Sequence, residues 1–319
     1  MALKKAYSIC DHGTAEHHED GYIAQYPLYA VIDGLSEPHS YKNPLKLFNG
    51  LSGGEMIVEV VKKVFSSIYP QPSLEEYVLI INNMIQRVLE TEGFSIKNAG
   101  LIPGASFVFA KIEDTAVRIL QGGDCLAVWR FASGEIGFIP NQAYRHVSQN
   151  LQTIHEILAR NEGNRKEMWV EFYPILSQRR QRDINNSTLE SGYAVLNGQP
   201  NVVKCWQKRE IPIRGLNTLL LFSDGFVPYY ETSDEKMEQL AERLLNEYKD
   251  SEYKDKVLTL KEMLERKRRE KSRKGKPSYI KHDEATALVL EFDNSEEPEK
   301  LMETIKALLL EKKEGNFFI

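Results

Sequence analysis

The pattern of apolar and polar positions divides the chain into short strands and amphipathic helices. Leu28–Ile32 is an apolar, partly β-branched run that stops at Asp33-Gly34, which is typical of a buried strand ending in a turn. Leu51–Tyr69 follows with its apolar residues on one helical face and Ser52 as a plausible N-cap. The N-terminal part of the chain is therefore predicted to pass from strands to a helix.

A second helix is predicted just beyond, and strands follow it. Ser73 and Glu76 have the spacing of a capping box, which indicates a helix start. The period then becomes strand-like over four runs: Ala105–Ile112, Ala116–Gln121, Cys125–Phe131 and Ile136–Ile139. The turns between these runs are too short for crossover helices, so they predict an antiparallel meander.

The rest of the chain is predicted to mix helices and strands. A short helix is expected at Leu151–Ala159, and Gln178–Asp183 is typical of a solvated loop. The strands expected are Gly192–Cys205, Thr218–Phe222 and Glu284–Phe292. The helices expected are Asp234–Tyr248, Lys256–Glu270 and a last one opened by Glu297-Pro298. Strands that cluster instead of alternating with helices indicate an α+β layered fold of antiparallel sheets covered by helices.

Composition and charge narrow the classes of protein. The chain has 319 residues, of which 42% are hydrophobic and 27% charged, as in a globular protein. A formal net charge of -5 argues against a nucleic-acid partner for the whole chain. The three cysteines (Cys10, Cys125 and Cys205) lack metal-ligand spacing and are expected to be reduced thiols. With no signal-peptide pattern and no apolar run of membrane-spanning length, a cytoplasmic location is expected.

Acidic residues recur where an apolar run meets a turn. They are Glu19-Asp20, Asp33, Asp124, Asp224 and Asp283. Carboxylates at strand ends are able to converge at one rim of a sheet, where their repulsion is relieved by a bound dication. Oxygen ligands without clustered His or Cys select Mg²⁺ or Mn²⁺, and two such ions suit the hydrolysis of a phosphate ester. A single Asp-Gly pair is more often only a turn, so the argument depends on the whole set.

The ordered set resembles the type 2C, metal-dependent (PPM-type) serine/threonine protein phosphatases, as a divergent, bacterial-like member. The resembling segments are Glu19-Asp20-Gly21, Tyr29–Gly34, Gly104-Ala105-Ser106, Gln121–Val128, Leu220–Phe226 and His282–Leu290. Each motif alone is weak, but six in the correct order are specific, and they cover residues 7 to 292. The resemblance implies a four-layer α-β-β-α sandwich of two antiparallel sheets with metals at one rim.

The resemblance also implies a reaction and roles for individual residues. A metal-bridging hydroxide would hydrolyse phosphoserine or phosphothreonine in a phosphorylated protein substrate. Asp33 would bridge two Mn²⁺ or Mg²⁺ ions, and the Gly34 carbonyl would bind one of them. Asp224 and Asp283 would complete the other site, and Glu19 and Asp20 would hold metal-bound waters. Asp124 matches the position for a weaker third ion.

Two departures from the family pattern keep other functions open. The stretch Asp11–His18 holds no Arg or Lys, where the family usually has a phosphate-binding arginine. Leu35–His39 replaces the glycine-rich turn that often follows Asp33-Gly34. One alternative is a catalytically weak or inactive member acting as a phosphoprotein-binding regulator or scaffold. Another is a hydrolase of small phosphoesters.

The N-terminal histidines and the basic stretch near the C-terminus each allow a structural and a functional interpretation. His12, His17 and His18 are more typical of polar loop residues near the acidic rim than of a zinc site. Lys261–Lys281 carries a local charge of +7, which favours a solvated helix and loop, although it could also steer an acidic substrate. A single phosphatase-like domain over residues 1–319 is expected, with a polar insert at about 148–192 and a basic insert at about 250–281. The oligomeric state is left open.

Overall fold

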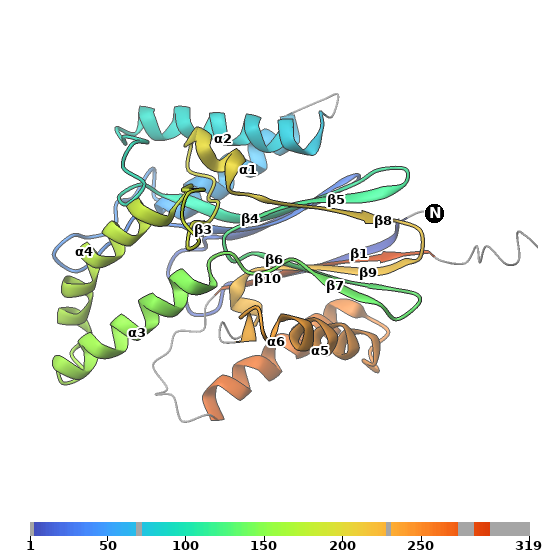
Figure 1. The fold of residues 1–319 in the computed structure, drawn as a ribbon. Coiled ribbons are helices and arrows are strands. Elements are labelled where there is room, and N and C mark those ends of the chain that lie inside the picture. The colour runs from blue at the N-terminus through green and yellow to red at the C-terminus, as the bar shows by residue number, and fades with distance from the viewer. Residues whose placement is uncertain (1–2, 68–71, 228–230, 274–283, 294–319) are drawn as a thin grey trace, which may run out of the picture.

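Two five-stranded antiparallel sheets form the centre of the molecule (Figure 1). The structure is a computed structural model that describes residues 3–67, 72–227, 231–273 and 284–293. The first sheet has the order β2 (Asp20–Gln25), β3 (Leu28–Leu35), β4 (Gly104–Ile112), β5 (Ala116–Gly122) and β8 (Gln207–Pro212). The second has the order β1 (Leu3–Asp11), β10 (Ala285–Phe292), β9 (Leu216–Phe222), β6 (Leu126–Phe131) and β7 (Ile136–Phe138).

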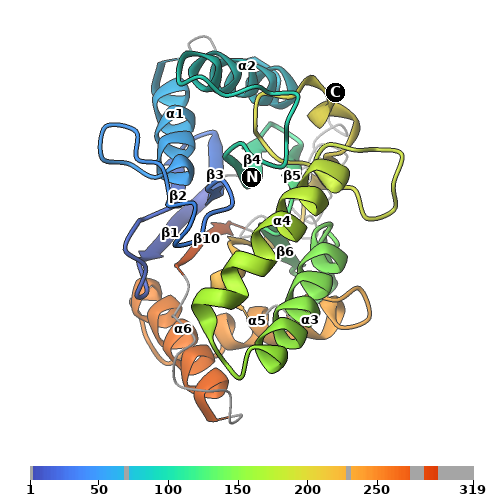
Figure 2. The same ribbon diagram turned by 90° about the vertical axis from the view of Figure 1, so that its left-hand side faces the viewer.

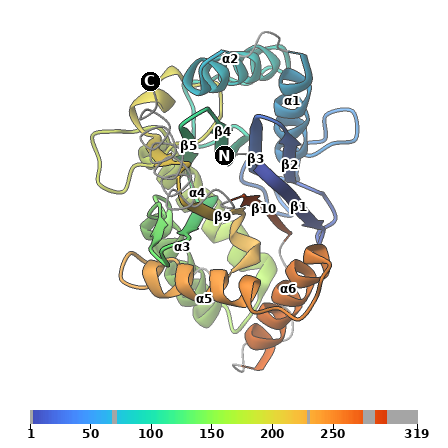
Figure 3. The same cartoon turned by 90° about the vertical axis from the view of Figure 1, so that its right-hand side faces the viewer.

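Helices cover the outer face of each sheet. α1 (Gly53–Ser67) and α2 (Leu74–Thr91) lie on the first sheet, and α5 (Met237–Lys249) and α6 (Lys256–Arg273) lie on the second, as Figures 1 and 3 show. The predicted α+β fold, a four-layer α-β-β-α sandwich, is confirmed. None of the helices in the described residues is long and apolar enough to cross a bilayer.

Apolar side chains fill all three interfaces between the layers. Val31, Val108 and Leu221 are fully buried between the two sheets. On the outer faces, Ile57 packs with the first sheet and Leu244 with the second. Burial of one such side chain stabilises the fold by about 1.5–3 kcal/mol, so these layers hold the strand ends in fixed positions.

The predicted helix starts are confirmed where capping residues define them. The Glu55 N–H donates to Ser52 Oγ at 3.1 Å, and the Ser52 N–H donates to Glu55 Oε2 at 2.7 Å. Ser73 and Glu76 form the predicted capping box at the start of α2. Reciprocal bonds of this kind satisfy backbone donors that a first helical turn leaves unpaired.

The predicted four-strand meander is wrong in its connectivity. β4 pairs with β5 and β6 pairs with β7, but the two hairpins lie in different sheets. The chain crosses between them at Gly122-Gly123-Asp124, where Gly123 has a φ of 75°. A Cβ at Gly123 would lie 2.1 Å from Ser106 Oγ, so only glycine fits this tight turn. The crossing brings Asp124 to the end of the sandwich.

A pair of helices that the sequence did not predict in full stands at one end of the sandwich. α3 (Tyr144–Arg160) and α4 (Arg165–Asp183) are joined by a short turn and face the strand ends (Figure 2). The predicted loop at Gln178–Asp183 is wrong, because these residues are the last turns of α4. Their polar side chains are satisfied by tertiary contacts: Arg179 donates to Asn150 Oδ1 and Thr153 Oγ1 on α3.

The predicted strand at Gly192–Cys205 is also wrong. The segment makes only isolated bridges and then forms the short 3₁₀ helix η1 (Pro200–Lys204). The Asn185 side chain takes the place of a neighbouring strand, since it donates to Val195 O and accepts from the Val195 N–H. The last helix, predicted to open at Glu297-Pro298, lies outside the described residues, as do Asp283 and the end of the basic stretch.

Candidate metal centre

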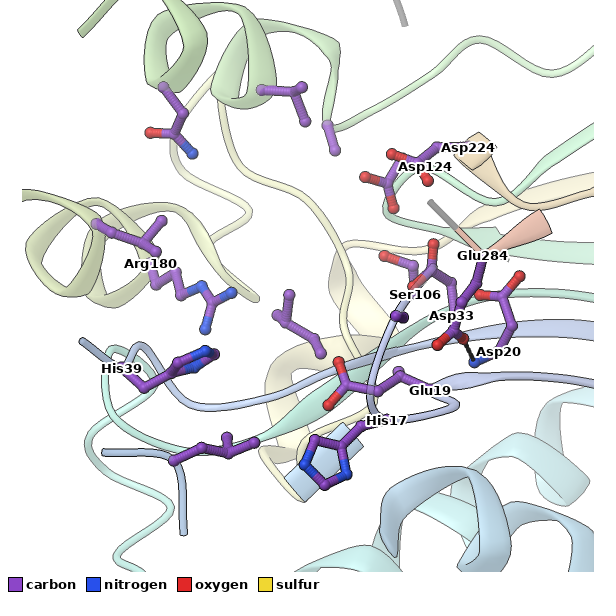
Figure 4. Close-up of a pocket in the computed structure, with 18 of the residues that line it drawn as sticks. His17, Glu19, Asp20, Asp33, His39, Ser106, Asp124, Arg180, Asp224 and Glu284 are labelled. Carbon is purple, nitrogen blue, oxygen red and sulfur yellow. Dashed lines mark hydrogen bonds between the residues drawn. The ribbon is translucent and has the colours of Figure 1, made fainter. Parts of the chain in front are cut away.

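Acidic residues from both sheets meet at the end of the sandwich that α3 and α4 face. Asp20 opens β2 and stands directly opposite Asp33 on β3 in the strand register. Asp124 follows β5, and Asp224 follows β9 at the start of the short helix η2 (Asp224–Phe226). Figure 4 shows these side chains on one side of a common cavity. Convergence at one rim is thus a feature of the fold for these four predicted carboxylates.

Asp20 links the two sheets at this rim. Ser223 Oγ, on the second sheet, donates to Asp20 Oδ2 at 2.7 Å. The Asp20 N–H donates to Glu284 Oε2 at 2.6 Å, a bond drawn in Figure 4. Ser223 is itself fixed, because the Thr286 N–H donates to its Oγ at 2.9 Å. Asp20 is therefore held in place by Ser223, which follows β9, and by Glu284, which precedes β10.

Glu19 is positioned by two serine hydroxyls and by the backbone of Gly34. Ser36 Oγ and Ser52 Oγ both donate to Glu19 Oε1. The Gly34 N–H donates to the carbonyl oxygen of Glu19 at 2.8 Å. A Cβ at Gly34 would stand 2.6 Å from that oxygen and 2.7 Å from Gly54 O, so the close backbone approach requires glycine.

The cavity has a volume of about 760 Å³ and is strongly acidic. It is lined by the carboxylates Glu19, Asp20, Asp33, Asp124, Asp224, Glu284 and Glu16. It is also lined by Arg180, His17, His39 and His146. The sequence predicted the first five carboxylates, and Asp283 lies outside the described residues.

The electrostatics of the rim favour a positive ligand. Burial, with the charges of neighbouring carboxylates added to it, raises the pKa of Asp33 well above its usual range. These neighbours are Asp20, Asp224, Asp124 and Glu19. Burial, again with nearby carboxylates, raises the pKa of Glu284 to about 7. The rim thus holds more negative charge than nearby positive groups of the protein compensate.

The donor chemistry fits a hard divalent cation. The side chains are carboxylates, which suit Mg²⁺ or Mn²⁺, and a bound dication would remove their repulsion. In the described part of the chain, no three carboxylate, imidazole or thiol groups already stand around one point as metal ligands would. The centre is therefore defined by charge and donor type, with one predicted ligand, Asp283, outside the described residues.

The three histidines near the N-terminus take roles within the loop. His17 Nδ1 lies 3.1 Å from Glu55 Oε2, and the His18 N–H donates to Glu55 Oε1 at 2.7 Å. The rings of His12 and His18 lie 3.7 Å apart. His39 lines the cavity, and its Nδ1 lies 3.2 Å from the carbonyl oxygen of Glu37.

Sequence reasoning missed the cavity wall built by α3 and α4. His146 Nδ1 lies 3.1 Å from Asp183 Oδ2, and both side chains are buried. Burial lowers the pKa of His146, although Asp183 opposes this. Arg180, also buried, lines the cavity from α4. No sequence spacing links His146 to Arg180 and Asp183, which follow it by 34 and 37 positions. Only the packing of the two helices reveals this wall.

The fold is shared with solved bacterial phosphatases. Serine/threonine phosphatase Stp1 from Staphylococcus aureus has a TM-score of 0.53 at 15% identity, over 92% of this chain and 96% of that one. The serine/threonine phosphatase PstP/Ppp of Mycobacterium tuberculosis has a TM-score of 0.53 at 16% identity, over 91% of this chain and 98% of that one. The catalytic domain of PstP in complex with two manganese ions has a TM-score of 0.52 at 18% identity, over 90% of this chain and 97% of that one.

These likenesses establish the class of fold. Neither a protein-family model nor a curated protein matches the sequence. The likeness to the solved structures alone confirms the family resemblance, and it does so at the level of the fold, which is that of the PPM-type serine/threonine phosphatases.

Proposed function

We propose that this chain is a Mn²⁺- or Mg²⁺-dependent phosphatase that acts on phosphoserine and phosphothreonine in proteins. The observation that carries the proposal is the gathering of the motif carboxylates Glu19, Asp20, Asp33, Asp124 and Asp224 around one cavity. This occurs in a fold of which one solved example, PstP, is in complex with two manganese ions.

The resemblance assigns the residues that would hold the ions. Asp33 would be shared between two ions, with the Gly34 carbonyl on one of them. Asp224 and Asp283 would hold the other. Glu19 and Asp20 would act through water, and Asp124 would hold a weaker third ion. Bound ions would lower the pKa of a coordinated water and neutralise charge on phosphoryl oxygens.

The chain's own residues keep this arrangement in place. The serine hydroxyls on Glu19 and the Ser223 hydroxyl on Asp20 fix the carboxylates before any ligand enters. In the reaction, a water oxygen forms a bond to phosphorus and the bond to the serine or threonine oxygen breaks. That oxygen leaves with a proton. A preorganised site of this kind loses little energy to rearrangement as the charges move.

Phosphate release tests the proposal directly. A phosphothreonine peptide and p-nitrophenyl phosphate are incubated with the protein in Mn²⁺, in Mg²⁺ and in EDTA. Asp33→Asn and Asp224→Asn are compared with Asp114→Asn, an exposed carboxylate on the turn between β4 and β5. We expect Mn²⁺-stimulated release from the peptide, lost in the two rim variants and retained in Asp114→Asn.

The other outcomes separate the alternatives. Turnover of the small ester without turnover of the peptide would favour a hydrolase of small phosphoesters. Metal binding by a folded protein that releases phosphate from neither substrate would favour the regulatory or scaffold function. Turnover that persists in EDTA and in Asp33→Asn would contradict a metal-dependent reaction at this rim.

A further inference from the structure

Arg180 is a buried cation on the far side of the acidic cavity. It lies in the last turn of α4, and only 8% of its surface is exposed. Figure 4 shows its guanidinium across the cavity from Asp33, Asp124 and Asp224. Among the described residues that line the cavity, it is the one arginine or lysine.

Among the described residues, the side chain has no partner for the ion pair that a buried arginine ordinarily makes. With the described residues it makes one hydrogen bond, in which Nη1 donates to the carbonyl oxygen of Ser36 at 2.6 Å. Within the described chain no carboxylate lies within 4 Å of its guanidinium, although Glu19, Glu37 and Asp124 are near enough to act on it electrostatically. Burial lowers the pKa of Arg180, but a guanidinium stays charged at any physiological pH.

Its neighbours on α4 behave differently. Arg179 donates to Asn150 and Thr153 on α3, and Arg182 makes two bonds to Asp183. Both of these arginines have structural partners and neither lines the cavity. Arg180 alone of the three presents its charge to the cavity.

The Ser36 contact ties Arg180 to the acidic rim. Ser36 accepts from Arg180 through its carbonyl oxygen and donates to Glu19 through its hydroxyl. One residue therefore fixes the guanidinium relative to the carboxylates. The guanidinium has five N–H donors in a rigid fork that matches two phosphoryl oxygens, and the Ser36 bond uses one of them.

We propose that Arg180 binds the phosphoryl oxygens of the substrate, in place of the arginine that Asp11–His18 lacks. The inference rests on the proposed function, in which divalent ions at the rim offset the charge of the carboxylates. The phosphoryl group then lies between the rim and α4, with Arg180 as a direct ligand from the helix pair. A lysine is a single point charge and is a weaker substitute for a bidentate guanidinium.

The test compares Arg180→Gln and Arg180→Lys with Arg179→Gln, a matched change one residue away that removes two contacts to α3. Binding of inorganic phosphate to the Mn²⁺-loaded protein is measured by calorimetry, and KM and kcat are measured on the phosphothreonine peptide. Circular dichroism and thermal unfolding establish that each variant is folded. We expect Arg180→Gln to weaken phosphate binding and to lower kcat/KM by about 10- to 100-fold, with Arg180→Lys between it and the wild type. Arg179→Gln should bind phosphate as the wild type does.

Several results would overturn the inference. Unchanged phosphate affinity in Arg180→Gln would do so, as would equal losses in Arg179→Gln. Full recovery in Arg180→Lys would reduce the role to the Ser36 hydrogen bond, which a lysine also makes. If Arg180→Gln does not fold, the comparison of Arg180→Lys with the wild type decides the question.

The failure of this inference is distinguishable from failure of the proposed function. Phosphate binding that depends on Arg180, in a protein without turnover, would support the inference and contradict the phosphatase. Turnover that is insensitive to Arg180 would support the phosphatase and overturn the inference. A wild-type protein that binds no phosphate with Mn²⁺ present would overturn it as well.

Discussion

Asp33 is held in an environment that disfavours its own charge. Burial and the four nearby carboxylates raise its pKa, so without metal the folded state loses stability as pH rises from the usual value of about 4 through the raised one. Asp33→Asn removes this loss. In EDTA at pH 8 we expect the variant to be more stable than the wild type by about 1 kcal/mol or more, since one unit of pKa corresponds to about 1.4 kcal/mol.

Urea unfolding followed by circular dichroism measures this difference. The gain should shrink toward pH 4, where the wild-type carboxyl is protonated. Excess Mn²⁺ should reverse the order of stability, because only the wild type keeps all of the proposed ligands. Asp114→Asn serves as the control and should stay within about 0.5 kcal/mol of the wild type at every pH. A variant less stable than the wild type in EDTA would show that Asp33 has a compensating partner.

The elements differ in how much of them the sequence reveals. Leu216–Phe222 and Ala285–Phe292 are compact apolar runs that end at charged turns, and their burial follows from the pattern alone. α4 lacks a single apolar stripe and contains Pro174, so periodicity could not predict it. The acidic rim was accessible from sequence because its residues fall at strand ends. Arg180 and His146 were not, since helix packing alone brings them to the cavity.

The C-terminal end of α4 depends on one buried carboxylate. Asp183 is fully buried and accepts from Arg182 Nε at 2.7 Å and from Ser191 Oγ at 2.9 Å. Burial opposes its charge, but these bonds and His146 more than offset it and lower its pKa. We expect Asp183→Asn to cost about 1.5–3 kcal/mol of unfolding free energy at neutral pH, which is the value of hydrogen bonds to a charged group.

The pH dependence of stability shows whether the charge of Asp183 or only its packing stabilises the fold. A lowered pKa gives stability that is present above about pH 4 and is lost as pH falls toward the folded-state pKa. The gap between the wild type and Asp183→Asn should therefore narrow below about pH 4. Glu190→Gln, an exposed carboxylate in the same region that pairs with Arg145, should cost little at any pH. A gap that is constant with pH would assign the effect to shape alone.

At the scale of the whole molecule, the candidate centre lies where the two sheets meet. Asp20 and Asp33 belong to the first sheet, whereas Asp224 and Glu284 flank strands of the second. The bonds from Ser223 to Asp20 and from Asp20 to Glu284 already cross between them. An ion bound by this set would join the sheets at the rim and stabilise both of them together, because a ligand that binds only the folded state adds to its stability.

Amide hydrogen exchange with and without Mn²⁺ tests this coupling. We expect Mn²⁺ to slow exchange in β2 and β3 and also in β9 and β10, with a gain of about 2.7 kcal/mol for amides that open by global unfolding when the ion is at 100 times its Kd. Asp33→Asn, which removes a proposed ligand from the first sheet only, should abolish the gain in both sheets. Protection confined to β2 and β3 would mean that the ion is held by one sheet, and that Asp224 lies at the rim without binding it.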